Sequence, residues 1–499
     1  MKTRMAVIAL LAACSLLLPF QPAAQSARPT ERALVFISDV HLGVGKDAGG
    51  NWMPIEDFRW PNALDGFLAY VERTYEGKAD LVILGDFLEL WQPFPGLACT
   101  DPEAEAGCSV AETAVLAAHV AAAHAADLKR LGDFSRRGEN RIYVVPGNHD
   151  AALILPEAWA NVAPAFGAGA RVELVEAGVW TSPSGLTVAE HGHQIHGDAN
   201  RFDRWPTVTK QPRPGHLQRP WGQLFVQKIY NDVEGEYPII DNIGPESVGV
   251  KYRIIDRGVV ASAADIARFL KFNLFETSRS QLGRFMSVAD AEPAWRVDLG
   301  RQAGHQLVLA SLEPGDELAA LIAEDSETGQ SLRDSLDAEV RQMPDDGIRQ
   351  LCEIAAMQDN HPCAPSVASH MGQSLLRSER AVVTPHLRAR EADHPSMINF
   401  VYGHTHAFRE PWSAVADGVR FTVANTGSFH RVVDEAGFKR RTRSLPRSRA
   451  LMSLVPEDLP ACYTFVVITD ERRGMELWRW HQPEDGTGSR VHASDPRCL

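Results

Sequence analysis

Short apolar runs that end in polar residues alternate with amphipathic stretches along the first third of the chain. The runs at 33–37, 80–84 and 141–145 have the length expected of buried strands. Between them, 61–72 carries apolar residues at helical spacing, and the Ala-rich stretch 110–136 predicts one long helix. This alternation predicts an α/β sheet whose ligand sites lie beyond the carboxyl ends of its strands.

The later part of the chain has a different pattern. Short apolar runs separated by turn residues predict a second, more antiparallel sheet, with strands at 186–190, 397–402, 420–424, 463–469 and 475–480. Between the first of these runs and the rest, the pattern predicts a mainly helical insertion, with helices at 261–286, 316–324, 331–343 and 367–377.

The first residues have the order of an export signal. Lys2 and Arg4 precede an apolar run over 5–20, which is too short to span a membrane, and small or polar residues continue to Ser26. We therefore expect cleavage after Ser26 and an exported protein in the periplasm or the extracellular space. A lipobox-like sequence at 11–14 leaves open a lipoprotein anchored through Cys14, and an uncleaved anchor is a third reading. Apart from such an anchor, no membrane contact is expected.

The composition places the chain among soluble globular proteins and narrows its partners. It has 499 residues, of which 44% are hydrophobic and 23% charged, and its formal net charge is −14. This charge argues against a generic nucleic-acid binder, so no nucleic-acid partner is expected. The one notable charge cluster is a basic segment at 439–449, and the oligomeric state is left open.

Six cysteines remain beyond Cys14, and an even number in an oxidising compartment favours disulfides. Six cysteines allow 15 connectivities. Local spacing suggests the pairs Cys99 with Cys108, Cys352 with Cys363, and Cys462 with Cys498.

Clustered His, Asp and Asn residues follow the apolar runs. They are Asp39 and His41, Asp86, Asn148 with His149 and Asp150, His191, and His404 with His406. Each motif alone is weak, but their shared position at strand ends is difficult to assign to chance. Carboxylate, imidazole and amide oxygen form a ligand set suited to Mn²⁺, Fe²⁺ or Zn²⁺, and a pair of ions needs a bridging carboxylate.

The order of these motifs resembles the calcineurin-like metallophosphoesterase family. The matching blocks are Asp39-Val40-His41, Gly85-Asp86, Gly147-Asn148-His149-Asp150, Glu190-His191-Gly192-His193 and Gly403-His404-Thr405-His406. The resemblance implies a four-layer α/β/β/α sandwich of two mixed sheets flanked by helices, with a large mainly helical insertion. We therefore divide the chain into a signal peptide (1–26), a catalytic core (30–198 and 395–485), an insertion or cap (199–394) and a tail (486–499).

The resemblance also implies two divalent ions, Mn, Fe or Zn, and a role for each matching residue. Asp39, His41 and His406 would hold one ion, and Asn148, His191 and His404 the other. Asp86 would bridge the two ions, which can activate a bridging hydroxide. His149, steered by Asp150, would be the general acid. His191 is preferred to the nearby His193 and His196 as the ligand because it directly follows its strand; His193, Arg201 and Arg204 are candidate substrate contacts.

Departures from the family pattern refine the expected function. Glu89 occupies the place where the purple acid phosphatase branch has its iron-binding Tyr, so that branch is not expected. The local sequence around Asp86 and Asp39 more closely resembles the UDP-diacylglucosamine pyrophosphohydrolase branch. The sequence thus predicts an exported phosphoesterase acting on monoester, diester or pyrophosphate bonds of a phosphorylated small molecule or lipid. The alternatives are an envelope phospholipid phosphohydrolase and a non-catalytic, metal-dependent binding protein.

Overall fold

The described part of the chain covers the catalytic motifs and most of the later segments. The computed structural model describes residues 32–195, 200–244, 252–253, 297–357, 362–363 and 379–498, apart from positions 93, 95, 98, 100–102, 313–315, 407, 417, 446–448, 485 and 493. The leader and the helices expected at 261–286 and 367–377 lie outside the described residues.

A seven-stranded sheet forms the first half of the core, in the order β16-β15-β14-β1-β2-β4-β5. Its strands are β1 (Ala33–Ile37), β2 (Ala79–Leu84), β4 (Arg141–Val145), β5 (Val172–Leu174), β14 (Cys462–Ile468), β15 (Glu476–His481) and β16 (Ser489–Val491). The strands β1, β2, β4 and β5 run parallel, as the strand and helix alternation predicts. Their carboxyl ends therefore meet at one edge of the sheet.

A five-stranded sheet forms the second half, in the order β11-β12-β10-β7-β6. Its strands are β6 (Val179–Thr181), β7 (Thr187–Glu190), β10 (Asn399–Tyr402), β11 (Trp412–Ala416) and β12 (Val419–Asn425). The expectation of a more antiparallel sheet is wrong: the three central strands β7, β10 and β12 run parallel, and only the two outer strands are antiparallel to their neighbours. Residues on both sides of the insertion thus build one sheet.

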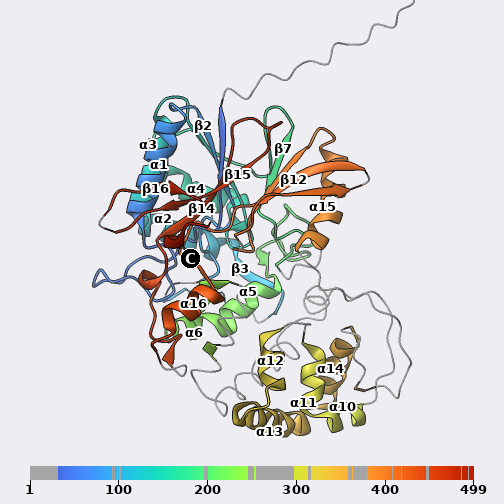
Figure 1. Ribbon diagram of the computed structural model, residues 1–499. Helices are drawn as coiled ribbons and strands as arrows, with labels where there is room; N and C mark the ends of the chain where they lie inside the picture. Colours follow the sequence, from blue (N-terminus) through green and yellow to red (C-terminus); the bar gives the residue numbers. More distant parts are fainter. Residues whose placement is uncertain are drawn as a thin grey trace, which may run out of the picture.

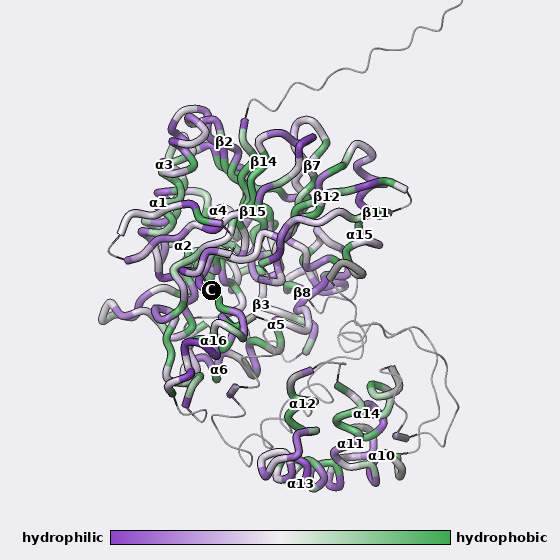
Figure 2. The backbone as a smooth tube through the Cα atoms, in the orientation of Figure 1, coloured by the Kyte–Doolittle hydropathy of each residue, from purple (hydrophilic) through white to green (hydrophobic). Residues whose placement is uncertain are grey.

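Alternation along the strands creates the layers. Leu34 and Phe36 of β1 pack with residues of the second sheet such as Val401, whereas Val35 and Ile37 pack on the other face against helices. Four helices lie on the first sheet: α1 (Pro61–Thr74), α2 (Val110–Ala123), α3 (Ala125–Arg136) and α4 (Pro156–Val162). Helix α15 (Glu379–Asp393) lies beside the second sheet (Figure 1). Hydropathy colouring shows the strands as apolar (Figure 2). The four-layer arrangement is confirmed.

Two further expectations about the core are corrected. The runs at 463–469 and 475–480 do not join the second sheet: β14 pairs antiparallel with β1, opposing Ile468 to Leu34, and β15 pairs with β14. The stretch 110–136 is not one helix, because the chain breaks at His124 between α2 and α3. The His124 ring contacts Asp127 and the buried Glu56, which hold it at the break.

The first part of the insertion packs on the core. It contains β8 (His216–Gln218), α5 (Trp221–Phe225), a π-helical turn (Val226–Tyr230), α6 (Asn231–Glu234) and β9 (Ile243–Gly244). Strand β8 pairs with β3 (Ala106–Ser109), and β9 pairs with β13 (Val433–Asp434), which is followed by α16 (Glu435–Thr442). Apolar side chains on both sides of the second pair share one cluster.

The later part of the insertion is a group of helices with its own apolar core. The helices are α10 (Val297–Ala303), α11 (His305–Ser311), α12 (Glu317–Ala323), α13 (Glu327–Gln342) and α14 (Asp345–Met357). Those expected at 316–324 and 331–343 are confirmed as α12 and α13. No described helix has the length and apolar character needed to cross a membrane.

All three suggested disulfides are present. Cys352 pairs with Cys363 beside the core of the helical group, and Cys462 with Cys498 joins β14 to the C-terminal residues. Cys99 pairs with Cys108 next to α2.

Candidate metal centre

The carboxyl ends of strands from both sheets bring the expected ligands together. The loop after β1 carries Asp39 and His41, the loop after β2 carries Asp86, and the loop after β4 carries Asn148. The second sheet contributes His191 after β7 and the pair His404 and His406 after β10. Residues separated by more than 350 positions in the sequence therefore meet in one site.

The backbone at these positions is held in an unusual conformation. The structure has six described non-glycine residues with positive φ, and five of them are expected ligands: Asp39, His41, Asp86, His404 and His406. Such left-handed positions cost about 1–2 kcal/mol each for an L-residue. Strain of this kind persists where surrounding structure imposes it, and it concentrates at functional sites.

Glycines allow the loops to approach each other. A Cβ on Gly147 would lie 2.2 Å from Asp86 Oδ1, and one on Gly85 would lie 2.5 Å from the His191 ring. A Cβ on Gly403 would lie 2.3 Å from the Ser38 hydroxyl. The glycines of three of the motifs are therefore needed for the close contact between the ligand-bearing loops.

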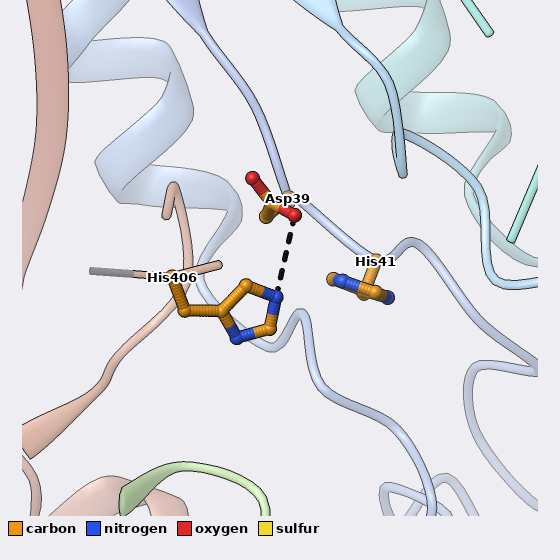
Figure 3. A group of neighbouring side chains, drawn as sticks. All are labelled: Asp39, His41 and His406. Atoms are coloured by element: carbon orange, nitrogen blue, oxygen red, sulfur yellow. Dashed lines mark ion pairs between the residues drawn. The ribbon is translucent and has the colours of Figure 1, made fainter. Parts of the chain in front are cut away.

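One cluster consists of Asp39, His41 and His406, whose potential ligand atoms lie within 4.8 Å of one another (Figure 3). His406 Nε2 is 3.3 Å from Asp39 Oδ1. Burial is the largest influence on the pKa of Asp39 and acts to raise it, but the neighbouring His406 and His191 outweigh it and lower the pKa to about 2. Asp39 is therefore a carboxylate at neutral pH.

The second cluster consists of Asp86, His191 and His404, again with ligand atoms within 4.8 Å. His191 Nδ1 donates to the Leu84 carbonyl over 2.7 Å, so Nε2 faces Asp86 Oδ2 and Asn148 Oδ1, each 2.9 Å away. A backbone bond from one imidazole nitrogen that aims the other at carboxylate and amide oxygens is the usual arrangement of a metal-binding histidine.

The residues present fit two divalent ions. His41 Nε2 is buried and has no hydrogen-bond partner, although its other nitrogen, Nδ1, contacts Glu89 over 3.0 Å. A buried imidazole lone pair without a partner is costly unless it binds something. The donor types, imidazole with carboxylate and amide oxygen, match the preferences of Mn²⁺, Fe²⁺ and Zn²⁺.

Glu89 is a residue of the site that the motifs did not single out. Its Oε2 accepts hydrogen bonds from His149 Nδ1, at 2.5 Å, and from His41 Nδ1, while its Oε1 accepts from the Trp91 amide at 2.7 Å. Burial, the largest influence, acts to raise the pKa of Glu89, but His149 and His41 outweigh it and lower the pKa to about 2. Glu89 therefore accepts both bonds as a carboxylate.

His149 lies beside both clusters. Its ring stacks on Trp91 with 3.9 Å between ring centroids, and its backbone N–H donates to Asp86 Oδ1 over 2.9 Å. Burial acts to lower the pKa of His149, but Glu89 and Asp86 outweigh it and raise the pKa to about 9. With Nδ1 bound to Glu89, the proton on Nε2 is the one that can be donated.

The expected partner of His149 is corrected. The Asp150 carboxylate does not contact the His149 ring; it accepts backbone N–H bonds from Gly147 and from residues 86–88, at 2.6–3.3 Å. Asp150 thus ties the second ligand loop to the third, and Glu89 orients His149. The sequence signal for Glu89 was its place three residues after Asp86.

The expected substrate contacts differ in burial. His193 is buried, with its ring centroid 5.5 Å from that of His191 and 4.4 Å from that of Trp205. Burial and the nearby His191 and His404 hold the pKa of His193 well below its usual value, and Arg201 adds to this effect. Arg204 is exposed. His196 lies outside the described residues.

His430 is a second residue that the motifs missed. It follows the turn after β12, its Nδ1 donates to the Asp39 carbonyl over 2.8 Å, and its ring centroid is 4.9 Å from that of His406. Burial and the His406 and His41 rings hold its pKa well below the usual value, so His430 is neutral.

Comparison with known families agrees with this geometry. The family model of the calcineurin-like phosphoesterases matches residues 33–270, which include β1, β2, β4 and β7 and the expected ligands that follow them. The chain contains a calcineurin-like phosphoesterase domain. A comparison with curated proteins gives no match. A calcineurin-like phosphoesterase domain implies a hydrolase of phosphoester bonds, and therefore a phosphorylated substrate.

Proposed function

We propose that the protein is an exported two-metal phosphoesterase that hydrolyses phosphate monoester, diester or pyrophosphate bonds, with His149 as the general acid. The observation that carries this proposal is the meeting of two ligand clusters, held by strained loops, with a protonated histidine beside them. A site built only for binding would not need an oriented proton donor next to the ligands.

In this proposal the chain's own residues divide into two ligand sets. Asp39, His41 and His406 would hold one ion, Asn148, His191 and His404 would hold the other, and Asp86 would be shared. Bound divalent ions would activate a water molecule and offset negative charge on the phosphoryl oxygens. Glu89 fixes His41 through Nδ1, which leaves Nε2 as the ligand atom.

His149 would supply the proton that the departing oxygen needs. Its Nδ1 is held by Glu89, so its Nε2–H is free to donate to the leaving group. Trp91 stacks on the ring and limits its rotation. Because the pKa of His149 is about 9, the ring carries its proton at neutral pH and can serve as an acid.

Export is supported by the three disulfides, which form and persist in oxidising compartments. The leader-like first residues support the same proposal. His193 would contact the substrate, since its ring lies beside those of His191 and His404, and Arg201, whose charge acts on His193, would assist it. The substrate would be a phosphorylated small molecule or a lipid.

A phosphoester panel tests the proposal. Purified protein is supplied with Mn²⁺, Zn²⁺ or Fe²⁺ and assayed on an alkyl monoester, an alkyl diester, a pyrophosphate and a phospholipid. We expect at least one class to be hydrolysed, with a loss of at least about 100-fold in Asp86→Asn, since a ligand shared by both ions is removed. Asp133→Asn, a matched change on the surface of α3, should retain activity. No hydrolysis of any class by metal-loaded, folded protein would refute the proposal.

A further inference from the structure

A cationic segment stands out in an acidic protein. Residues 436–456 contain six Lys or Arg residues and no Asp or Glu, whereas the whole chain has a formal net charge of −14. A solvated loop of ordinary composition would mix both signs. None of the described residues among these six belongs to the two ligand clusters.

The fold turns the charges of this segment outward. Phe438, Leu451 and Leu454 are buried in a cluster with residues of the insertion such as Ile240 and Ile243. Asp434 caps α16 by accepting the Gly437 N–H over 2.6 Å. The described basic residues of the segment are all exposed: Lys439, Arg440, Arg441, Arg443 and Arg449. The packing thus places a buried apolar cluster beneath the exposed basic residues.

The neighbouring carboxylates neutralise only a small part of this charge. Glu435 pairs with Lys439 over 2.5 Å, whereas Glu457, at the far end of the segment, pairs with Arg59 of another loop over 3.3 Å. Arg440 and Arg443 form no ion pair within the described chain. The surface therefore carries uncompensated positive charge.

Apolar side chains are exposed in the same stretch of the chain. Met452 and Val455 are each 43% exposed, and they are two of only four large hydrophobic side chains that the described residues expose to this extent. Cationic side chains next to exposed aliphatic ones suit a lipid surface, where headgroups bind the charges and the apolar groups enter the interface. Residues 439–455 contain no aromatic side chain on which a nucleic-acid base could stack.

The segment is connected directly to the catalytic site. His430, beside His406, leads through β13 into α16, and β13 pairs with β9 of the insertion. Figure 1 shows α16 at the lower end of the sheets, beside α6. We propose that residues 439–445 and 449–455 form a docking surface for an anionic lipid bilayer. Docking goes beyond the proposed hydrolysis and does not depend on it.

Vesicle co-sedimentation of the full chain tests this proposal without any turnover. The vesicles are pure phosphatidylcholine or phosphatidylcholine with about 30% phosphatidylglycerol, an anionic lipid content of the kind that attracts basic segments. We expect preferential binding to the anionic vesicles, weakened when NaCl is raised. Any N-terminal apolar segment would insert equally into both vesicle types. The difference in bound protein between the two types therefore measures binding by the charged surface.

Paired variants assign the binding. Arg440→Glu/Arg443→Glu should lower binding to anionic vesicles by at least about 25-fold, because each removed cation is expected to weaken binding about five-fold. Arg472→Glu/Arg473→Glu makes the same charge change at the exposed turn before β15 and should lower binding much less. Met452→Ser/Val455→Ser should lower binding a few-fold. A circular dichroism spectrum and a urea unfolding midpoint equal to those of the wild-type protein show that each variant is folded.

Three results would overturn the proposal. The first is wild-type protein that binds neutral and anionic vesicles equally. The second is an equal loss in the two double-arginine variants, which would reduce the effect to net charge. The third is salt-sensitive binding of duplex DNA without vesicle binding, which would make the segment a nucleic-acid surface.

Discussion

Replacing Glu89 by Gln separates the proton donor from the rest of the site. Glu89 Oε2 contacts His149 Nδ1 at 2.5 Å, and its charge is the largest influence that raises the pKa of His149, to about 9. Gln keeps the size of the side chain and removes the charge. The pKa of His149 should then fall towards about 6.5, the ordinary value for histidine.

The loss of activity follows from the protonated fraction of His149. At pH 8 the fraction would fall from about 90% to about 3%, a loss of about 30-fold, whereas at pH 6 the loss would be less than about two-fold. The loss should appear with an alkyl leaving group, which needs a proton. It should be much smaller with a p-nitrophenyl leaving group, which departs as a stable anion.

The assay measures kcat for both substrates from pH 6 to pH 9, with the metal content of each preparation determined. The metal measurement is needed because Glu89 also holds His41. Asp133→Asn serves as the control for a surface charge change. An equal loss for both leaving groups and at every pH, with unchanged metal content, would show that Glu89 does not act through the proton of His149.

Three further predictions concern stability and packing. The pKa of His124 is raised to about 9, so the protonated ring stabilises the fold by about 3 kcal/mol. This contribution is complete below pH 6.5 and is lost as the pH rises through 9. The free energy of urea unfolding of His124→Gln should lack this loss, and a pH slope identical to that of the wild type would contradict the prediction. Gly147→Ala should lower metal content and hydrolysis at least about ten-fold, because the added Cβ would force Asp86 away. Gly235→Ala is the control, because a Cβ there would meet no atom within 4 Å. Equal effects of the two substitutions would contradict the steric explanation. Cys462→Ser opens a disulfide that spans 36 residues and should cost about 4 kcal/mol in urea unfolding, whereas a loss below about 1 kcal/mol would refute the estimate.

The strand ends could be predicted because their signal is local. An apolar run followed by Asp39 or Asp86 predicts both a buried strand and a polar group at its end. The parallel sheet then brings these strand ends together. The disulfides were predictable for a similar reason, since each pair is close in sequence. The ligand roles within the site stay predictions.

The remaining features depend on distant parts of the chain. β14 joins the first sheet because β1 has a free edge, and a local pattern contains no information about that edge. The helix break at His124 depends on Glu56, which lies 68 positions earlier. Glu89 contacts His149 from 60 positions earlier in the sequence. The sequence predicts the adjacent Asp150 as the partner of His149, but Asp150 binds backbone N–H groups instead.

Metal stoichiometry measured together with activity tests the central claim most directly. Protein stripped by a chelator is titrated with Mn²⁺ or Zn²⁺ while bound metal per chain and hydrolysis of a responsive phosphoester are both recorded. We predict that activity returns as about two ions bind per chain, the number used by paired-ion phosphoesterases, and that Asp86→Asn neither binds both ions nor regains activity. Full activity in the stripped protein, or in Asp86→Asn, would contradict the two-metal account.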